Sequence, residues 1–273
     1  MENFNGNPQS LALLKLGGSL ITEKTRPRTL RRDTLNRLAA EIAAAFEQKP
    51  SLKLILGHGA GSFAHVSAKR HGTRKGVHTR EEWRGFAEVW WDAATLNRFV
   101  LDALIAAGLP AVAFPPSASV IARDGEVARW DLDPIKASLK AKLLPVIHGD
   151  VIFDLERGGT ILSTEDLFVH LARQLHPDRL LLAGIEPGVW ENYPDRSQII
   201  SKITTANHEE ILPALSGSAA TDVTGGMESK VQQCLILSKE IPDLETLIFT
   251  GDRPGQLLEV LLGARIGTII SSE

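Results

Sequence analysis

The chain has 273 residues, of which 43% are hydrophobic and 23% are charged, and its formal net charge is −3. These values are typical of a globular protein and exclude a disordered or fibrous chain. The slightly acidic balance argues against bulk electrostatic attraction to nucleic acid, so we expect no nucleic-acid partner.

No segment contains the roughly 18 consecutive apolar residues that a membrane span needs, so we expect no membrane association. Residues 1–10 are polar and lack the basic flank and apolar run of a signal peptide, which predicts a flexible N-terminal tail. The single cysteine, Cys234, excludes an intrachain disulfide framework and a thiolate metal cluster. Together these features predict a soluble cytoplasmic protein.

Short apolar runs alternate along the chain with segments of helical periodicity. Runs of about five residues predict strands that are covered on both faces, at 11–16, 52–56, 110–114, 143–147, 179–185 and 246–249. Helical periodicity predicts helices at 30–46, 81–107, 163–175 and 228–240. Asp133 is the predicted N-cap of a further helix, because Pro134 suits the first helical position. Turn signals predict hairpins within 120–130 and 151–162.

Strands that alternate with helices predict an α/β protein, a three-layer αβα sandwich with a mainly parallel central sheet. We expect residues 11–273 to form a single domain, since no linker or repeat interrupts them. In such sheets ligands bind beyond the carboxyl ends of the strands, where glycine-rich turns meet helix N-termini. The glycine-rich turns are therefore the first candidates for chemistry.

The first candidate turn follows the first predicted strand. Lys15 stands near the end of that strand, Gly17, Gly18 and Ser19 form the turn, and Lys24 lies nine positions after Lys15. Paired glycines let backbone N–H groups approach a phosphate, while a lysine supplies positive charge. Because the Walker A pattern is absent, a strand-to-helix turn without a ligand is an equal alternative for this motif alone.

The second candidate is the run from His58 to His65, which also follows a strand and opens a helix. Gly59, Ala60 and Gly61 provide backbone N–H groups for an anion, and His65 lies early on the helix, where an imidazole can donate to a phosphate oxygen. A surface or capping role is the alternative for His65. We expect His58 to be packed beneath the turn.

The third candidate pairs Gly225 and Gly226 with Lys230, one turn into a later helix. Lys15 and Lys230 would repel each other unless an anion or a carboxylate lay between them, and Asp166 is a candidate for that carboxylate. A solvated helix position is the alternative for Lys230. No metal cage or hydrolase triad is evident, so no metal ligands are predicted and phosphate chemistry is favoured.

These motifs, in this order, resemble the amino acid kinase superfamily and, within it, the isopentenyl phosphate kinases. Residues 15–19 look like the nucleotide-phosphate turn of that family, and residues 58–65 are similar to its His-Gly-Gly-Gly-Ser-Phe-Gly-His signature, with alanine at 60 and 64. Residues 147–150, 163–166 and 221–227 match further motifs. The resemblance implies an amino acid kinase-like domain, with an acceptor lobe at about 11–175 and a nucleotide lobe at about 176–273.

The resemblance also implies roles for individual residues. The implied catalytic residues are Lys15, Lys24, His65, Asp166 and Lys230, with Asp166 holding the lysines in position. The implied ATP-binding residues are Lys15, Gly17, Gly18, Ser19, Gly61, Gly184, Gly188, Gly225, Gly226 and Lys230. Gly59, Ala60, His65 and Thr164 are implied at the acceptor phosphate. The run 184–190 departs from the family pattern, which leaves the preferred nucleotide base open.

An apolar stripe on the helix after His65 is expected to wall the tail of a prenyl acceptor, although an ordinary core stripe is an equal alternative. Its members are Phe86, Val89, Trp90 and Ala93. The implied reaction is transfer of the γ-phosphoryl group of ATP, with Mg²⁺, to isopentenyl phosphate, in a homodimer. A kinase for another small phosphate or phosphonate, similar to fosfomycin kinase, and a non-catalytic anion or nucleotide binder are the alternatives.

Overall fold

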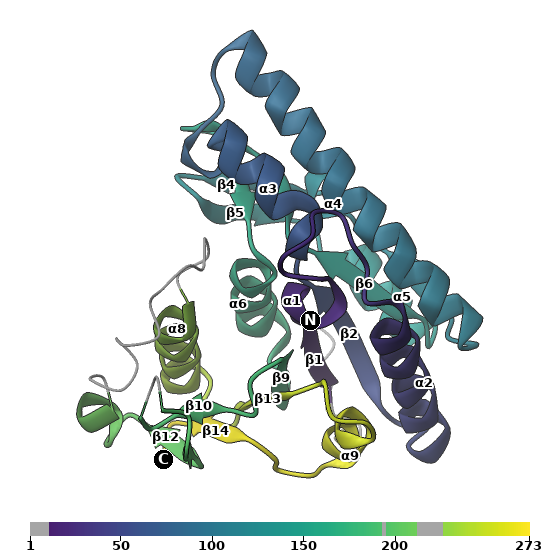
Figure 1. Ribbon diagram of the computed structural model, residues 1–273, viewed down its shortest axis with the longest axis vertical. Coiled ribbons are helices and arrows are strands. Elements are labelled where there is room, and N and C mark those ends of the chain that lie inside the picture. Colours follow the sequence, from purple (N-terminus) through teal and green to yellow (C-terminus); the bar gives the residue numbers. More distant parts are fainter. Residues whose placement is uncertain (1–10, 193–194, 212–225) are drawn as a thin grey trace.

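The computed structural model describes residues 11–192, 195–211 and 226–273, and its centre is a mainly parallel sheet with helices on both faces (Figure 1). Among its described strands, only β13 and β14 pair antiparallel. The predicted α/β fold is confirmed. In sheet order the strands are β12 (Lys202–Thr204), β14 (Thr268–Ser271), β13 (Glu245–Thr250), β9 (Arg179–Gly184), β1 (Leu11–Leu16), β2 (Lys53–His58), β6 (Leu144–His148) and β3 (Ala111–Ala113).

The two faces of the sheet carry separate apolar cores, because successive strand residues point to opposite sides. Leu14 and Leu54 face one core, and Leu13 and Ile55 face the other. The first core holds helices α1 (Gly18–Ile21), α2 (Arg32–Gln48), α4 (Arg80–Ala106) and α9 (Gln256–Leu262). The second holds α5 (Asp133–Lys140), α6 (Thr164–Leu175) and α8 (Gly226–Glu240). Burial on both faces explains why these strands are almost uniformly apolar.

The two predicted hairpins are confirmed and form a second, four-stranded sheet beside α3 (Gly61–His71) and α4. Its strands, in order, are β5 (Glu126–Trp130), β4 (Val120–Arg123), β7 (Asp150–Asp154) and β8 (Gly158–Leu162). Two strands, β10 (Val189–Trp190) and β11 (Ile199–Ile200), pair separately, and η1 (Thr73–Lys75) and η2 (Pro116–Ala118) are 3-10 turns. A third apolar cluster joins α3, α4, β7 and β8.

Most element predictions agree with the structure, and the exceptions have local causes. Asp133 was predicted as an N-cap, but the N-cap of α5 is Leu132, and Asp133 is the first helical residue. Strands β10, β11, β12 and β14 and helix α9 were not predicted; none of these elements is longer than seven residues. The predicted tail at residues 1–10 and the predicted site residue Gly225 lie outside the described residues.

The parallel registers bring the candidate turns to one edge of the sheet. Leu16, at the end of β1, is paired with His58 at the end of β2 and with Ala183 near the end of β9. His58 is in turn paired with His148 at the end of β6. The turns that follow these strands therefore emerge side by side, although they are far apart in the sequence.

Candidate active site

The first two glycine turns touch each other above the sheet edge. The Gly17 N–H donates to the Ala183 carbonyl at 2.8 Å, and the Gly59 N–H donates to the Leu16 carbonyl at 3.0 Å. A Cβ atom on Gly18 would lie 2.6 Å from the Cα atom of Gly61, so a side chain there would collide with backbone. Glycine is required at this position because the two main chains pass so close together.

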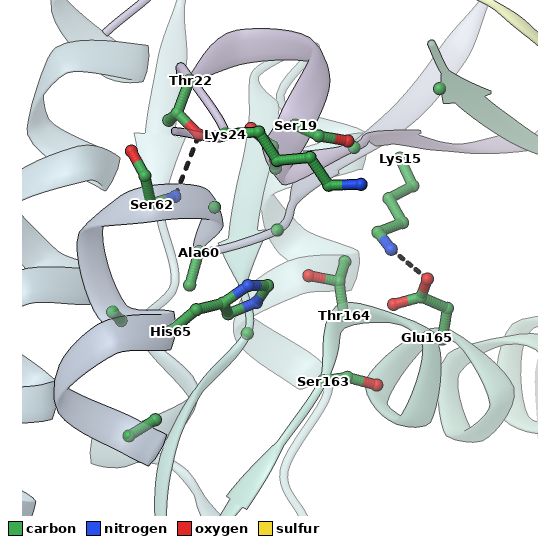
Figure 2. A pocket seen from close by; sticks show the side chains of 18 of the residues that line it. Lys15, Ser19, Thr22, Lys24, Ala60, Ser62, His65, Ser163, Thr164 and Glu165 are labelled. Carbon is green, nitrogen blue, oxygen red and sulfur yellow. Dashed lines mark hydrogen bonds and ion pairs between the residues drawn. The ribbon is translucent and has the colours of Figure 1, made fainter. Parts of the chain in front are cut away.

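A cavity of about 1380 Å³ opens over these turns and collects the predicted cationic residues. Lys15, Lys24, His65 and Lys230 all line it, and Figure 2 shows the side chains of Lys15, Lys24 and His65 directed into the same space from three elements. Among the described residues, its lining contains eight Lys and Arg residues against three Asp and Glu residues. An excess of positive charge in a concave site attracts polyanionic ligands.

The carboxylate of Glu165 interacts electrostatically with both Lys15 and Lys230. Lys15 forms an ion pair with Glu165, and the two side chains are only 12% and 11% exposed (Figure 2). Burial alone would raise the pKa of the Glu165 carboxyl, but Lys15 and Lys230 together lower it below its usual range. Glu165 is therefore ionised at neutral pH, where it offsets the repulsion between the two lysines.

The prediction that Asp166 holds the lysines in position is wrong for Lys15, whose partner is Glu165, because Asp166 is used to cap its own helix. Its carboxylate accepts hydrogen bonds from the backbone and side chain of Ser163, both at 2.8 Å, while Ser163 accepts from the Asp166 N–H. This capping box opens α6. Asp166 also pairs with Arg74 at 3.2 Å, so it fixes the start of the helix that presents Glu165.

The end of the cavity that is expected to hold the acceptor is formed by the second glycine turn, α3 and the start of α6. Ala60 has a φ of −74°, which a residue with a Cβ atom adopts without strain. His65 lies one turn into α3 and is half-buried. The Thr164 hydroxyl donates to the His58 carbonyl at 2.6 Å, so its one proton is already used. Only the backbone N–H of Thr164, at the first position of α6, can donate to an anion.

Part of the predicted apolar stripe faces the cavity and part does not. Val89 and Ala93 line it and are buried. Trp90 is 41% exposed and Phe86 packs against Trp83, and neither is among the residues that line the cavity. Val89 and Ala93 are therefore the members of the stripe that line the cavity, and the wall role of Phe86 and Trp90 stays a prediction. Trp90 follows Val89 by one residue, which turns its side chain about 100° away around the helix.

The part of the cavity that is expected to hold the nucleotide follows β9. Gly184 lines the cavity together with Glu186 and Trp190, and the Trp190 indole N–H donates to the Glu186 carboxylate at 2.8 Å. Gly188 is not among the residues that line the cavity, and a Cβ atom on it would lie 2.7 Å from the Thr268 hydroxyl. The remaining predicted ATP-binding residues within the described ranges line the cavity: Lys15, Gly17, Gly18, Ser19, Gly61, Gly226 and Lys230.

A buried pair of imidazoles lies beneath the second glycine turn. His58 stacks on His148 with ring centroids 5.4 Å apart, and His58 Nε2 lies 3.0 Å from the Asn97 side-chain oxygen. Burial lowers the pKa of both histidines to about 4, so both are neutral at pH 7. Burial raises the pKa of the neighbouring Asp150 to about 6. His58 therefore supports the turn from below, as expected from the sequence.

Comparisons with known proteins agree with this architecture. The model of the amino acid kinase family matches residues 10–249. The chain belongs to the amino acid kinase family. This family member is 34% identical to the isopentenyl phosphate kinase of Methanothermobacter thermautotrophicus, over 96% of this chain and 100% of the relative. It is 35% identical to the isopentenyl phosphate kinase of Methanocaldococcus jannaschii, over 95% of this chain and 98% of that relative.

A solved structure of an isopentenyl phosphate kinase superposes on this chain with a TM-score of 0.79, at 30% identity, covering 96% of this chain and all of that one. The resemblance seen in the sequence motifs is therefore confirmed over nearly the whole chain. Among the helices that the structure describes, none has the length and apolar character to span a membrane.

Sequence reasoning missed two residues of the site, Glu165 and Thr22. The pattern Ser163 to Asp166 carries a signal for the first, because a capping box commits its fourth residue to the N-cap and leaves Glu165 available. Thr22 lies at the end of α1 and lines the cavity, where its hydroxyl bonds to both glycine turns. No pattern in the sequence pairs Thr22 with residue 62.

Proposed function

We propose that this protein transfers the γ-phosphoryl group of ATP to the phosphate of isopentenyl phosphate, giving isopentenyl diphosphate and ADP. The proposal depends on one observation: Lys15, Lys24, Lys230 and His65 share one cavity with two glycine turns in contact. Two polyanions repel each other in water, and a cationic cavity lined by fixed N–H groups offsets that repulsion. The isopentenyl phosphate kinases to which the chain is similar support the choice of acceptor.

At the donor end, Lys15 and Lys230 would bind the phosphates of ATP, with the N–H groups of Gly17, Gly18 and Gly226 beside them. Glu165 holds the Lys15 ammonium in place before the nucleotide arrives, because the ion pair removes most of its freedom. A pre-positioned cation stabilises charge on the transferring group without reorganisation during the reaction. Lys24 lines the same cavity and would neutralise charge on the phosphoryl group in transfer.

At the acceptor end, His65 and the N–H groups of Gly59, Ala60 and Thr164 would hold the acceptor phosphate. The nucleophile is a phosphate oxygen that is already anionic at neutral pH, so the chain needs no strong general base. The task of these residues is to orient that oxygen in line with the bond that breaks. Val89 and Ala93 supply an apolar wall for a short hydrocarbon tail.

The cavity fits ATP, because its glycine turns leave no side chain between their N–H groups and a phosphate. Among the described residues, no group of three or more His, Cys, Asp or Glu side chains could hold a metal ion. We therefore propose that Mg²⁺ binds through the phosphates of ATP and water, where it neutralises phosphate charge. The cytoplasmic location and the homodimer are further predictions from sequence.

A panel of acceptors tests the proposal. ADP release is measured with isopentenyl phosphate, dimethylallyl phosphate and fosfomycin at equal concentration, with and without EDTA. We expect the highest kcat/KM with isopentenyl phosphate and loss of turnover with EDTA. A higher kcat/KM with fosfomycin would reassign the acceptor, and binding of ATP without turnover of any acceptor would indicate a non-catalytic binder.

A further inference from the structure

A buried threonine joins the two glycine turns and anchors the segment that carries Lys24. Thr22 ends α1 and is 1% exposed. Its hydroxyl donates to the Gly18 carbonyl at 2.7 Å and accepts from the Ser62 N–H at 3.0 Å. A hydroxyl has one proton to donate and lone pairs to accept, so this single group satisfies a partner in each turn.

The space around this hydroxyl is closed on the side of the second turn. Gly61 has a φ of +50°, and a Cβ atom there would lie 2.7 Å from the Gly18 carbonyl and would also collide with the Thr22 side chain. The contact between the turns therefore consists of backbone on both sides and the Thr22 hydroxyl between them. A change in this hydroxyl acts on the spacing of the two turns directly.

Ser62 also fixes the far end of the segment from Thr22 to Arg28. The Ser62 N–H donates a hydrogen bond to the Thr22 hydroxyl, while the Ser62 carbonyl accepts one from the Arg28 N–H at 3.0 Å. Lys24 lies between these two attachment points, and Figure 2 shows its side chain extending from this segment over the cavity. The position of the Lys24 ammonium therefore depends on Ser62, the second residue of α3.

We propose that Thr22 is a positioning residue, whose hydroxyl sets the distance between the donor and acceptor turns and holds the Lys24 segment above them. The inference depends on the proposed function. In-line transfer requires the two reacting phosphates to be held at a fixed separation, and an error of about 1 Å can reduce the rate about 100-fold. Each turn still binds its own ligand when the link is lost, because its N–H groups are unchanged.

The test compares Thr22→Val, which keeps the shape and removes the hydroxyl, with Thr22→Ser, which keeps the hydroxyl. Thr246→Val is the matched control: Thr246 lies in β13, is fully buried, and its hydroxyl bonds to no atom of the described chain. We measure kcat, the Kd of ATP alone, the Kd of isopentenyl phosphate alone, and the hydrogen exchange of the Ser62 amide.

We expect Thr22→Val to lower kcat about 10- to 100-fold and to change each Kd less than about threefold. The Ser62 amide hydrogen should exchange faster in this variant, because it loses its acceptor on Thr22. Thr22→Ser is expected to keep kcat within about threefold of the wild type, and Thr246→Val to leave it unchanged. A kcat for Thr22→Val within about twofold of the wild type, or an equal loss in Thr22→Ser, would overturn the inference.

Hydrogen exchange of the Ser62 amide in the wild-type protein tests the Thr22–Ser62 hydrogen bond even if Thr22→Val does not fold. The Ser62 amide is expected to be protected without any ligand, and exchange at the rate of an unstructured amide would overturn the inference. This measurement needs no turnover. Failure of the wild type to phosphorylate isopentenyl phosphate would instead count against the proposed function alone, so the two failures are distinguishable.

Discussion

Replacing Glu165 with glutamine tests whether this carboxylate, and not that of Asp166, organises the lysines. Glutamine has nearly the same size but carries no charge, so Lys15 and Lys230 lose the anion that lies near both. Breaking a buried ion pair costs about 3–5 kcal/mol. Because this pair borders a cavity and glutamine can still accept a hydrogen bond from Lys15, we expect a smaller loss of stability, about 2 kcal/mol.

In a chain of this size a loss of about 2 kcal/mol lowers Tm by roughly 4–8 °C. Repulsion between the lysines would also displace Lys15, so we expect kcat to fall about 100-fold. Thermal unfolding without ligand and steady-state ADP release measure the two effects. Because ATP supplies negative charge between the lysines, saturating ATP should raise the Tm of Glu165→Gln more than that of the wild type.

Asp166→Asn is the matched control, one residue away on the same helix. It weakens the capping box of α6, which costs about 1 kcal/mol, and it leaves the Lys15 ion pair intact. We expect its kcat to stay within about threefold of the wild type. A larger loss of kcat in Asp166→Asn than in Glu165→Gln would refute this assignment and restore Asp166 as the organising carboxylate.

The pH dependence gives a second check on Glu165. The pKa of its carboxyl is lowered in the folded protein. The unfolded chain therefore binds the proton more tightly, and the ion pair stabilises the fold above the ordinary pKa of glutamate. This stabilisation is lost as the pH falls through the lowered pKa. The Tm difference between the wild type and Glu165→Gln should be largest near pH 7 and should shrink in acid.

Three further predictions concern other parts of the site. His65→Ala should lower kcat/KM for the acceptor at least about 10-fold and leave the Kd of ATP nearly unchanged by calorimetry, because His65 lies at the acceptor end. Lys230→Ala should weaken ATP binding about 10-fold or more, whereas Lys239→Ala, an exposed position on the same helix, should not. His148→Phe should keep the stack on His58. The free energy of unfolding, measured with urea, should fall about 3 kcal/mol less between pH 6.5 and 4 in this variant than in the wild type.

The effect expected for His148→Phe follows from the lowered pKa of His148. The unfolded chain binds the proton near pH 6.5 and the folded protein only near pH 4, so acid stabilises the unfolded chain across that window. Asp150, whose raised pKa has the opposite effect, is retained in the variant. Equal pH profiles for His148→Phe and the wild type would contradict the prediction, as would unchanged acceptor kinetics for His65→Ala or unchanged ATP affinity for Lys230→Ala.

Local sequence determined the elements of this fold and the chemistry of its turns. Apolar runs such as 11–16 form strands because both of their faces are covered, and glycine pairs such as Gly17 and Gly18 allow backbone to approach backbone. The helix start at Ser163 is encoded within four residues by a capping box. Each of these features depends on neighbours in the chain, so a reader of the sequence can find it.

Only the tertiary structure decided which side chains meet. Glu165 and Asp166 are adjacent carboxylates, and the rotation of about 100° per helical residue directs one to Lys15 and commits the other to the helix cap. The same rotation separates Trp90 from Val89, which lines the cavity. The bond from Ser62 to Thr22 spans 40 positions, and strand register, which no local pattern contains, brings its two ends together.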